Sequence, residues 1–180
     1  MDNIDNTNET DINNETPIEQ SLTESTESSG KKKSRTTKPV RTFPAYSIRE
    51  AMKIPKILGE KNAGNPWTPE NIAEVMKISS ASNSFFYLTS ASRDYGFTIG
   101  TSRAKKIELT SLGRKLVFPE SSDEEKECIL EAFLNIGVFK NVYEYYNQGL
   151  NLPEDKYLSN TLRETFNIDS SYHEDFIKIF

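Results

Sequence analysis

The feature that most constrains the fold is a run of helix and turn signals between residues 68 and 110. Thr68 precedes Pro69, a pair that favours a helix start because threonine caps free amide groups and proline fits the first helical position. A serine-rich turn follows over residues 78–82 and offers a serine that can cap a second helix. Gly96 predicts the end of that helix in a left-handed cap. The segment therefore predicts two short helices joined by a turn.

The second helix, residues 82–95, divides into two faces by helical spacing. One face is expected to be buried: Phe85, Leu88, Ala91, Ser92 and Tyr95. The opposite face consists of Asn83, Phe86, Ser90 and Arg93, with Ser82 and Tyr87 at its edges. We expect this second face to point outward, where a partner can reach it.

Two short stretches after this helix, residues 97–99 and 106–109, alternate apolar and polar side chains as half-buried strands do. The turn between them carries the cations Arg103, Lys105 and Lys106. A further helix is predicted after Thr110, with Gly113 allowing close packing and with Leu112, Leu116 and Val117 inward.

The segment before Thr68 predicts one more helical element. Ser47 and Glu50 form a capping box, followed by apolar residues at helical spacing. Pro55 interrupts this pattern and predicts a kink or two short helices, because proline removes a hydrogen bond. Gly59 and residues 64–66 are expected to end the element. In the helix after Thr68, the residues expected inward are Ile72, Ala73, Val75 and Met76.

A family resemblance rests on the stretches FPAYSIREAMKI, PWTPENIAEVM and SSASNSFFYLTSASRDYGF, and on a strand pair closed by LTSLGRKL. The chain resembles a prokaryotic winged helix-turn-helix family of unassigned function, and it is similar to winged-helix transcription regulators, where LT-x-x-G commonly follows the wing. The resemblance implies a winged helix-turn-helix domain over residues 43–118, with residues 82–95 as recognition helix and residues 100–106 as basic wing. Sequences of this kind often have basic residues where this chain has Phe86 and Tyr87.

Residues 119–180 predict a helical extension. Ser122 and Glu125 form a second capping box, so the acidic run between them is a solvated helix start. The residues that helical spacing places inward are Ile129, Ala132, Phe133, Val138, Val142, Tyr145, Tyr146, Tyr157, Leu158, Leu162, Phe166, Phe176, Ile177 and Phe180. The last apolar stripe must pack on the chain's own core, on a second copy, or on residues outside this sequence. The extension is interpreted as a dimerisation element or as a partial second helix-turn-helix.

Charge is distributed unevenly along the chain. The net charge is -5, but residues 119–180 carry 13 acidic and 5 basic side chains, whereas residues 31–118 carry 17 basic and 6 acidic ones. Residues 1–40 are expected to be a disordered tail. Its end overlaps a basic arm, residues 31–41, which includes Lys31, Lys32, Lys33 and Arg35. This arm is either a phosphate-binding segment or a solubilising linker.

The sequence offers little for catalysis or metal binding. A single cysteine, Cys128, and a single histidine, His173, cannot supply converging zinc ligands. No glycine-rich phosphate loop occurs. We expect no enzyme activity, no cofactor and no metal, with Cys128 a small buried or half-buried residue and His173 a polar residue in the first turn of a helix. The single cysteine and the lack of a signal peptide or long apolar run predict a cytoplasmic protein with no membrane association.

Two functions fit these features. The first is a regulatory DNA-binding protein that acts on double-stranded DNA as a homodimer formed through its C-terminal helices. Its predicted DNA contacts are Ser82, Asn83, Phe86, Tyr87, Ser90, Arg93, Arg103, Lys105, Lys106, Lys31, Lys32, Lys33 and Arg35. The second is a protein-interaction or scaffold module that uses Phe86, Tyr87 and the acidic helical tail, because aromatic residues commonly anchor protein interfaces.

Overall fold

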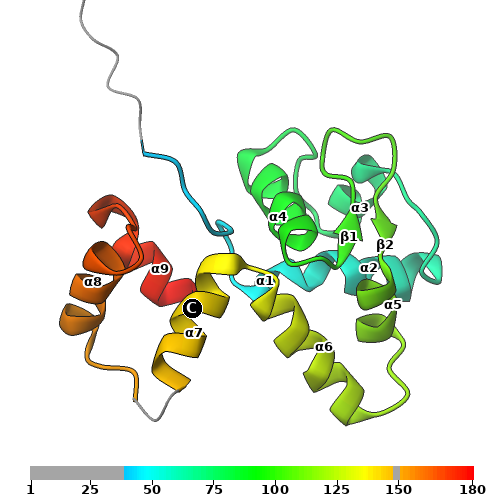
Figure 1. Cartoon of the computed structure of the whole chain (residues 1–180). Coiled ribbons are helices and arrows are strands. Elements are labelled where there is room, and N and C mark those ends of the chain that lie inside the picture. The colour runs from blue at the N-terminus through cyan, green and yellow to red at the C-terminus, as the bar shows by residue number, and fades with distance from the viewer. Residues whose placement is uncertain (1–38, 148–150) are drawn as a thin grey trace, which may run out of the picture. The chain divides into compact units, whose positions relative to one another are not determined.

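Helices make up most of the part of the chain that the structure describes, and one small antiparallel sheet accompanies them (Figure 1). The computed structural model describes residues 39–147 and 151–180. The predicted disordered tail and the arm residues Lys31, Lys32, Lys33 and Arg35 lie outside these ranges. None of the described helices has the length and apolar character needed to span a bilayer. The prediction of a mainly helical chain with a small hairpin is confirmed.

The elements follow one another as α1 (Ile48–Ala51), α2 (Lys53–Asn62), α3 (Pro69–Val75), α4 (Asn83–Asp94), β1 (Thr98–Ile99), β2 (Glu108–Leu109), α5 (Ser111–Val117), α6 (Ser122–Leu134), α7 (Gly137–Asn147), α8 (Asp155–Glu164), the 3-10 helix η1 (Ser170–Tyr172) and α9 (His173–Ile179). The hairpin is formed by β1 and β2, with Thr98 opposite Leu109.

Side-chain caps begin several helices where the sequence predicts them. Ser47 and Glu50 form the capping box of α1. Thr68, Ser82 and Thr110 each accept a hydrogen bond from a backbone N–H in the first turn of α3, α4 and α5, respectively. Local sequence alone therefore sets these helix starts.

Three details of the helix boundaries differ from or refine the predictions. The predicted break near Pro55 is confirmed, since α1 and α2 are separate helices that meet at Met52. The prediction that Gly59 ends the element is wrong, since it lies inside α2. Glycine serves close packing at this position, because a Cβ there would come within 1.9 Å of the Val117 side chain. The cap of α6 is Ser121 rather than Ser122, which is already the first residue of the helix.

One core cluster lies beneath α2, α3, α4 and the hairpin. It consists of Ile54, Leu58, Ile72, Ala73, Phe85, Leu88, Ile107 and Leu109. The face of α4 that was predicted to be inward is buried throughout. Val75, predicted inward, is exposed instead, because it lies at the end of α3, beyond the buried pair Ile72 and Ala73.

The hairpin departs from the predicted alternation in β1. Ile99 is 61% exposed, whereas Thr98 is buried. The reason is that Thr98 faces the last turns of α4, where its hydroxyl donates a hydrogen bond to Ser92 Oγ at 3.1 Å. The second strand follows the prediction, with Ile107 and Leu109 both buried.

A second, aromatic cluster surrounds Phe139, which is fully buried in α7. Its ring centroid lies 5.1 Å from that of Phe133, 5.3 Å from Phe176, 5.6 Å from Phe180 and 6.4 Å from Tyr95. The apolar stripe that ends the chain therefore packs on the chain's own core.

Two tyrosines of the extension were placed on the wrong side. Tyr145 and Tyr157 are exposed, although helical spacing predicted them inward. In α7 the buried positions are Phe139, Val142 and Tyr146, because this side of the helix meets the aromatic cluster.

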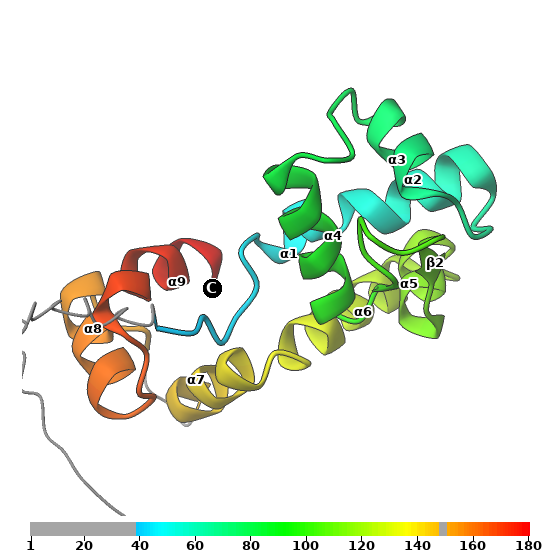
Figure 2. The same cartoon turned by 90° about the horizontal axis from the view of Figure 1, so that it is seen from above.

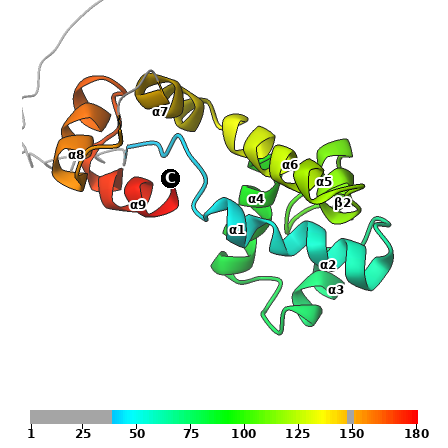
Figure 3. The same cartoon turned by 90° about the horizontal axis from the view of Figure 1, so that it is seen from below.

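The segment before α1, residues 39–47, contacts the C-terminal helices and links them to the rest of the described chain (Figure 3). The Arg41 guanidinium lies 4.9 Å from the Phe43 ring centroid and 5.1 Å from that of Tyr172, and it pairs with Asp175. The Tyr172 hydroxyl donates to the Pro39 carbonyl at 2.7 Å. Arg41, predicted to end a free basic arm, is therefore held by two rings and a carboxylate instead.

The helix α5 approaches the start of the hairpin most closely at Gly113. A Cβ atom at this position would lie 2.0 Å from the Phe97 carbonyl oxygen. The Thr110 hydroxyl donates to the Gly96 carbonyl at 2.6 Å, and its oxygen accepts from Gly113 N–H at 2.9 Å. The spacing of Thr110 and Gly113 thus joins the cap of α5 to the residues that follow α4.

Gly113→Ala is expected to lower the free energy of unfolding by about 1–3 kcal/mol, because the methyl group must displace backbone. Gly137 is the matched control, since nothing lies within 4 Å of a Cβ built there. Gly137→Ala should keep stability within about 0.5 kcal/mol or raise it. Urea unfolding of both variants measures the difference, and equal stabilities would contradict the close contact.

Candidate nucleic-acid interface

The outward face of α4 and the loop of the hairpin lie side by side (Figures 1 and 2). On α4, the exposed predicted residues are Asn83, Tyr87 and Arg93, and the half-buried ones are Ser82, Phe86 and Ser90. On the loop, Arg103, Lys105 and Lys106 are exposed. The structure therefore leaves the predicted face of α4 outside the core.

A contact between Arg103 and Phe86 joins the two parts. The Arg103 guanidinium carbon lies 5.1 Å from the centroid of the Phe86 ring, within the range of a cation–π interaction. The Phe86 ring also meets the Tyr87 ring edge to face, with centroids 5.3 Å apart. One side of Phe86 is therefore engaged within the chain, while Tyr87 remains 49% exposed.

The backbone of the loop is tied to α4 by a residue that sequence analysis missed. Ser102 N–H donates to Thr89 Oγ1 at 3.0 Å, and Thr89 is fully buried. The base of the loop needs a glycine: Gly100 has φ +92, and a Cβ there would lie 2.6 Å from the Lys106 carbonyl oxygen. A threonine at the border of the two faces of α4 was the only sequence signal for this tie.

A hollow of about 550 Å³ opens between these elements. Its walls come from Glu70 in α3, the turn at residues 80–82, Asn83, Phe86 and Tyr87 in α4, and Ser102 and Arg103 in the loop. This hollow brings together predicted residues from both the helix and the loop. The Glu70 carboxylate places one negative charge at its wall, which disfavours a phosphate at that point.

Among the α4 residues that were predicted to contact DNA, Arg93 lies at the opposite end of the helix from Asn83. It lies ten residues after Asn83, about 15 Å farther along the helix axis. Its guanidinium donates two hydrogen bonds to the Asp94 carboxylate, at 2.7 and 3.1 Å. Arg93 must therefore leave Asp94 before it binds a base.

The cations of the loop differ from Arg93 in their contacts with carboxylates. Among the described residues, no ion pair involves Arg103, Lys105 or Lys106. These three charges are therefore open to an anionic partner in the part of the chain that the structure covers.

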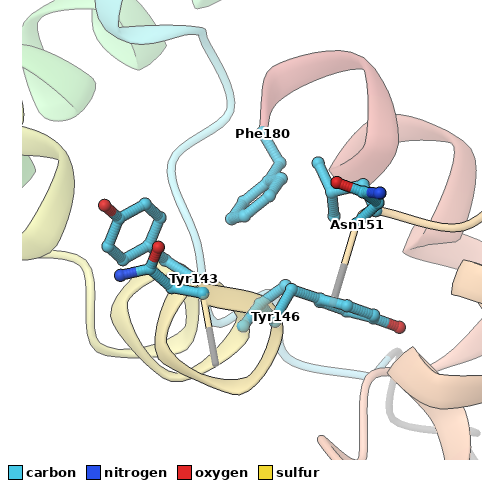
Figure 4. A pocket seen from close by; sticks show the side chains of 7 residues that line it. Tyr143, Tyr146, Asn151 and Phe180 are labelled. Carbon is cyan, nitrogen blue, oxygen red and sulfur yellow. The ribbon is translucent and has the colours of Figure 1, made fainter. Parts of the chain in front are cut away.

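A second hollow, of about 340 Å³, lies among the C-terminal helices (Figure 4). Tyr143, Tyr146, Asn151 and Phe180 line it together with other uncharged residues. This lining provides little with which to hold a charged ligand, so the helix and loop surface is the better candidate site.

Cys128 and His173, the two side chains with a capacity for metal binding or nucleophilic chemistry, are distant in sequence from α4 and the loop. Both are buried. No group of three or more metal-ligating side chains occurs among the described residues. Cys128 is buried, and burial, followed by the nearby Glu124 charge, raises the pKa of its thiol. His173 begins α9 and is buried, with Nε2 2.9 Å from the Ile168 carbonyl oxygen. Both residues have the structural placement that the sequence suggests.

No family model, curated protein or solved structure matches the chain. The resemblance to winged-helix proteins therefore stays a prediction, and the functional assignment depends on the geometry of α4 and the loop.

Cys128 is expected to react with a disulfide reagent at least about 100-fold more slowly than a free thiol at pH 8, because it is buried and its raised pKa leaves less thiolate. Absorbance of the released thiol, measured in buffer and in denaturant, tests this expectation. Rapid labelling of the folded chain would contradict the buried placement.

Proposed function

We propose that residues 43–118 form a winged helix-turn-helix that binds double-stranded DNA, with α4 as the recognition helix and residues 100–106 as the wing. The observation that carries this proposal is the continuous surface formed by the outward face of α4 and a cationic loop, joined through Arg103 and Phe86. The helix has 12 residues, about 18 Å, and the major groove of B-DNA is wide enough to admit a helix.

The side chains on this surface suit different parts of a duplex. Asn83, exposed at the first position of α4, has the amide that pairs with adenine, and Phe86 and Tyr87 offer apolar contacts for thymine methyl groups. Arg103, Lys105 and Lys106 would contact phosphates or the minor groove. Phosphate contacts fix the register, whereas the helix reads bases.

Arg93 would contact DNA after it releases the Asp94 carboxylate. Its ion pair with Asp94 is solvent-exposed, and exposed pairs contribute little to stability, so a guanine edge or a phosphate can replace the carboxylate.

The charge distribution supports contact through residues 31–118, which carry 17 basic and 6 acidic side chains. Residues 119–180 carry 13 acidic and 5 basic side chains, which repel a polyanion.

A regulatory role and a homodimer are part of the same proposal. Because the last apolar stripe is occupied by the chain's own core, a dimer through these helices would use exposed residues such as Tyr145 and Tyr157.

The direct test is fluorescence anisotropy with a labelled mixed-sequence duplex over a salt series. Alanine at Arg103, Lys105 or Lys106 is expected to lower the slope of log affinity against log salt by about 0.9 for each phosphate that the variant no longer neutralises. Lys126→Ala is the control, since Lys126 is exposed on α6 and pairs with Asp123. Absence of duplex binding at low salt would overturn the proposal.

A protein-docking function has its own supporting observation: Tyr87 is a large, half-exposed aromatic residue beside Phe86. Aromatic side chains are frequent interface anchors. In this alternative, the acidic helical tail takes part in the same assembly.

Tyr87→Ser separates the two functions because it leaves the contact between Phe86 and Arg103 in place. For a docking module, light scattering should show loss of a self-complex, or a pull-down loss of a bound protein, with duplex affinity unchanged. For a DNA-binding helix, the variant should lose duplex affinity by roughly 5-fold or more, equivalent to about 1 kcal/mol, with its assembly state unchanged.

A further inference from the structure

Thr89 occupies an unusual position in α4. It is fully buried, although it stands between the inward face, represented by Phe85, and the outward face, represented by Phe86. Threonine is a weaker helix former than leucine or alanine, so helix formation alone does not favour it here. The hydroxyl therefore requires a separate explanation.

The hydrogen bonds of this hydroxyl point in two directions. A threonine hydroxyl has one hydrogen and two acceptor lone pairs. The Phe85 and Phe86 carbonyl oxygens, each 3.0 Å from Thr89 Oγ1, share the hydrogen within the helix. A lone pair is then directed at the hairpin loop, where Ser102 N–H donates at 3.0 Å.

We propose that Thr89 is a positioning residue. Its hydroxyl holds the loop against α4 and thereby places Arg103 for contact with DNA. This role in DNA binding rests on the function proposed above. Among the described residues, the bond from Ser102 is the only hydrogen bond between α4 and residues 100–106. Ser102 immediately precedes Arg103, so a fixed backbone at one residue fixes the origin of the next side chain.

The contact between Arg103 and Phe86 is too weak to do this by itself. A cation–π contact at an exposed site contributes less than the rotational entropy that a held arginine side chain loses. A backbone N–H bonded to a buried acceptor is shielded from water and opens less readily. The tether at Ser102 therefore fixes the backbone from which the Arg103 side chain starts, at a position where its guanidinium can reach the Phe86 ring.

The variants Thr89→Val and Thr89→Ser test this role. Valine removes the hydroxyl and keeps a similar shape, whereas serine keeps the hydroxyl. Thr98→Val is the matched control, because Thr98 is also buried and its hydroxyl bonds to Ser92 without touching the loop. Thr89→Ala, which favours helix formation, serves as a second hydroxyl-free variant where the valine variant does not fold.

The first measurement needs no DNA. Amide hydrogen exchange of Ser102, followed by NMR and compared with core amides, should become at least about 10-fold faster in Thr89→Val and in Thr89→Ala. Thr89→Ser and Thr98→Val should leave it unchanged. Unchanged exchange in the hydroxyl-free variants overturns the tether.

The second measurement is the salt dependence of duplex binding. Thr89→Val should reduce the slope as Arg103→Ala does, and the double variant should show no further reduction. Faster exchange with an unchanged slope overturns the positioning of Arg103. If the unmodified chain binds no duplex, the proposed function fails together with the DNA role of Thr89, and the exchange rate of Ser102 still decides whether Thr89 holds the loop.

Discussion

The contact of α5 with the chain that leaves α4 holds the candidate site together. Thr110 bonds to the Gly96 carbonyl and caps α5, while Gly113 lets the helix approach the Phe97 carbonyl where a side chain would collide. This contact fixes the base of the hairpin against the end of α4. The loop at the other end of the hairpin is then brought beside the outward face of the same helix, where Ser102 reaches Thr89.

The helical extension is joined to this unit by aromatic packing. Phe139 contacts rings from several helices, including Tyr95 at the end of α4. Burial of each such ring contributes roughly 2–3 kcal/mol, so the extension is part of the folded body rather than an appendage. Arg41 adds a second attachment through Phe43, Tyr172 and Asp175. Because Arg41 is paired with Asp175, the basic arm has one cation fewer with which to bind an anion.

The inward and outward faces of α4 were predictable because both follow from helical periodicity over consecutive residues. The placement of Phe86, Tyr87 and Arg93 outside the core was therefore within reach of sequence reasoning. Ile99 was not, because β1 has only two residues, too few for alternation to establish which side is inward. Thr89 was missed for a related reason: its role depends on a partner thirteen residues away, in the loop of the hairpin.

The sequence by itself determined the helix starts at Ser47, Thr68, Ser82 and Thr110, because each cap joins atoms only three residues apart. Only the tertiary structure decided how distant segments pair. Arg41 and Asp175 are separated by 134 positions, and nothing in the local pattern of either residue specifies the other. Such contacts depend on where whole helices come to rest, and this is set by the packing of the shared core.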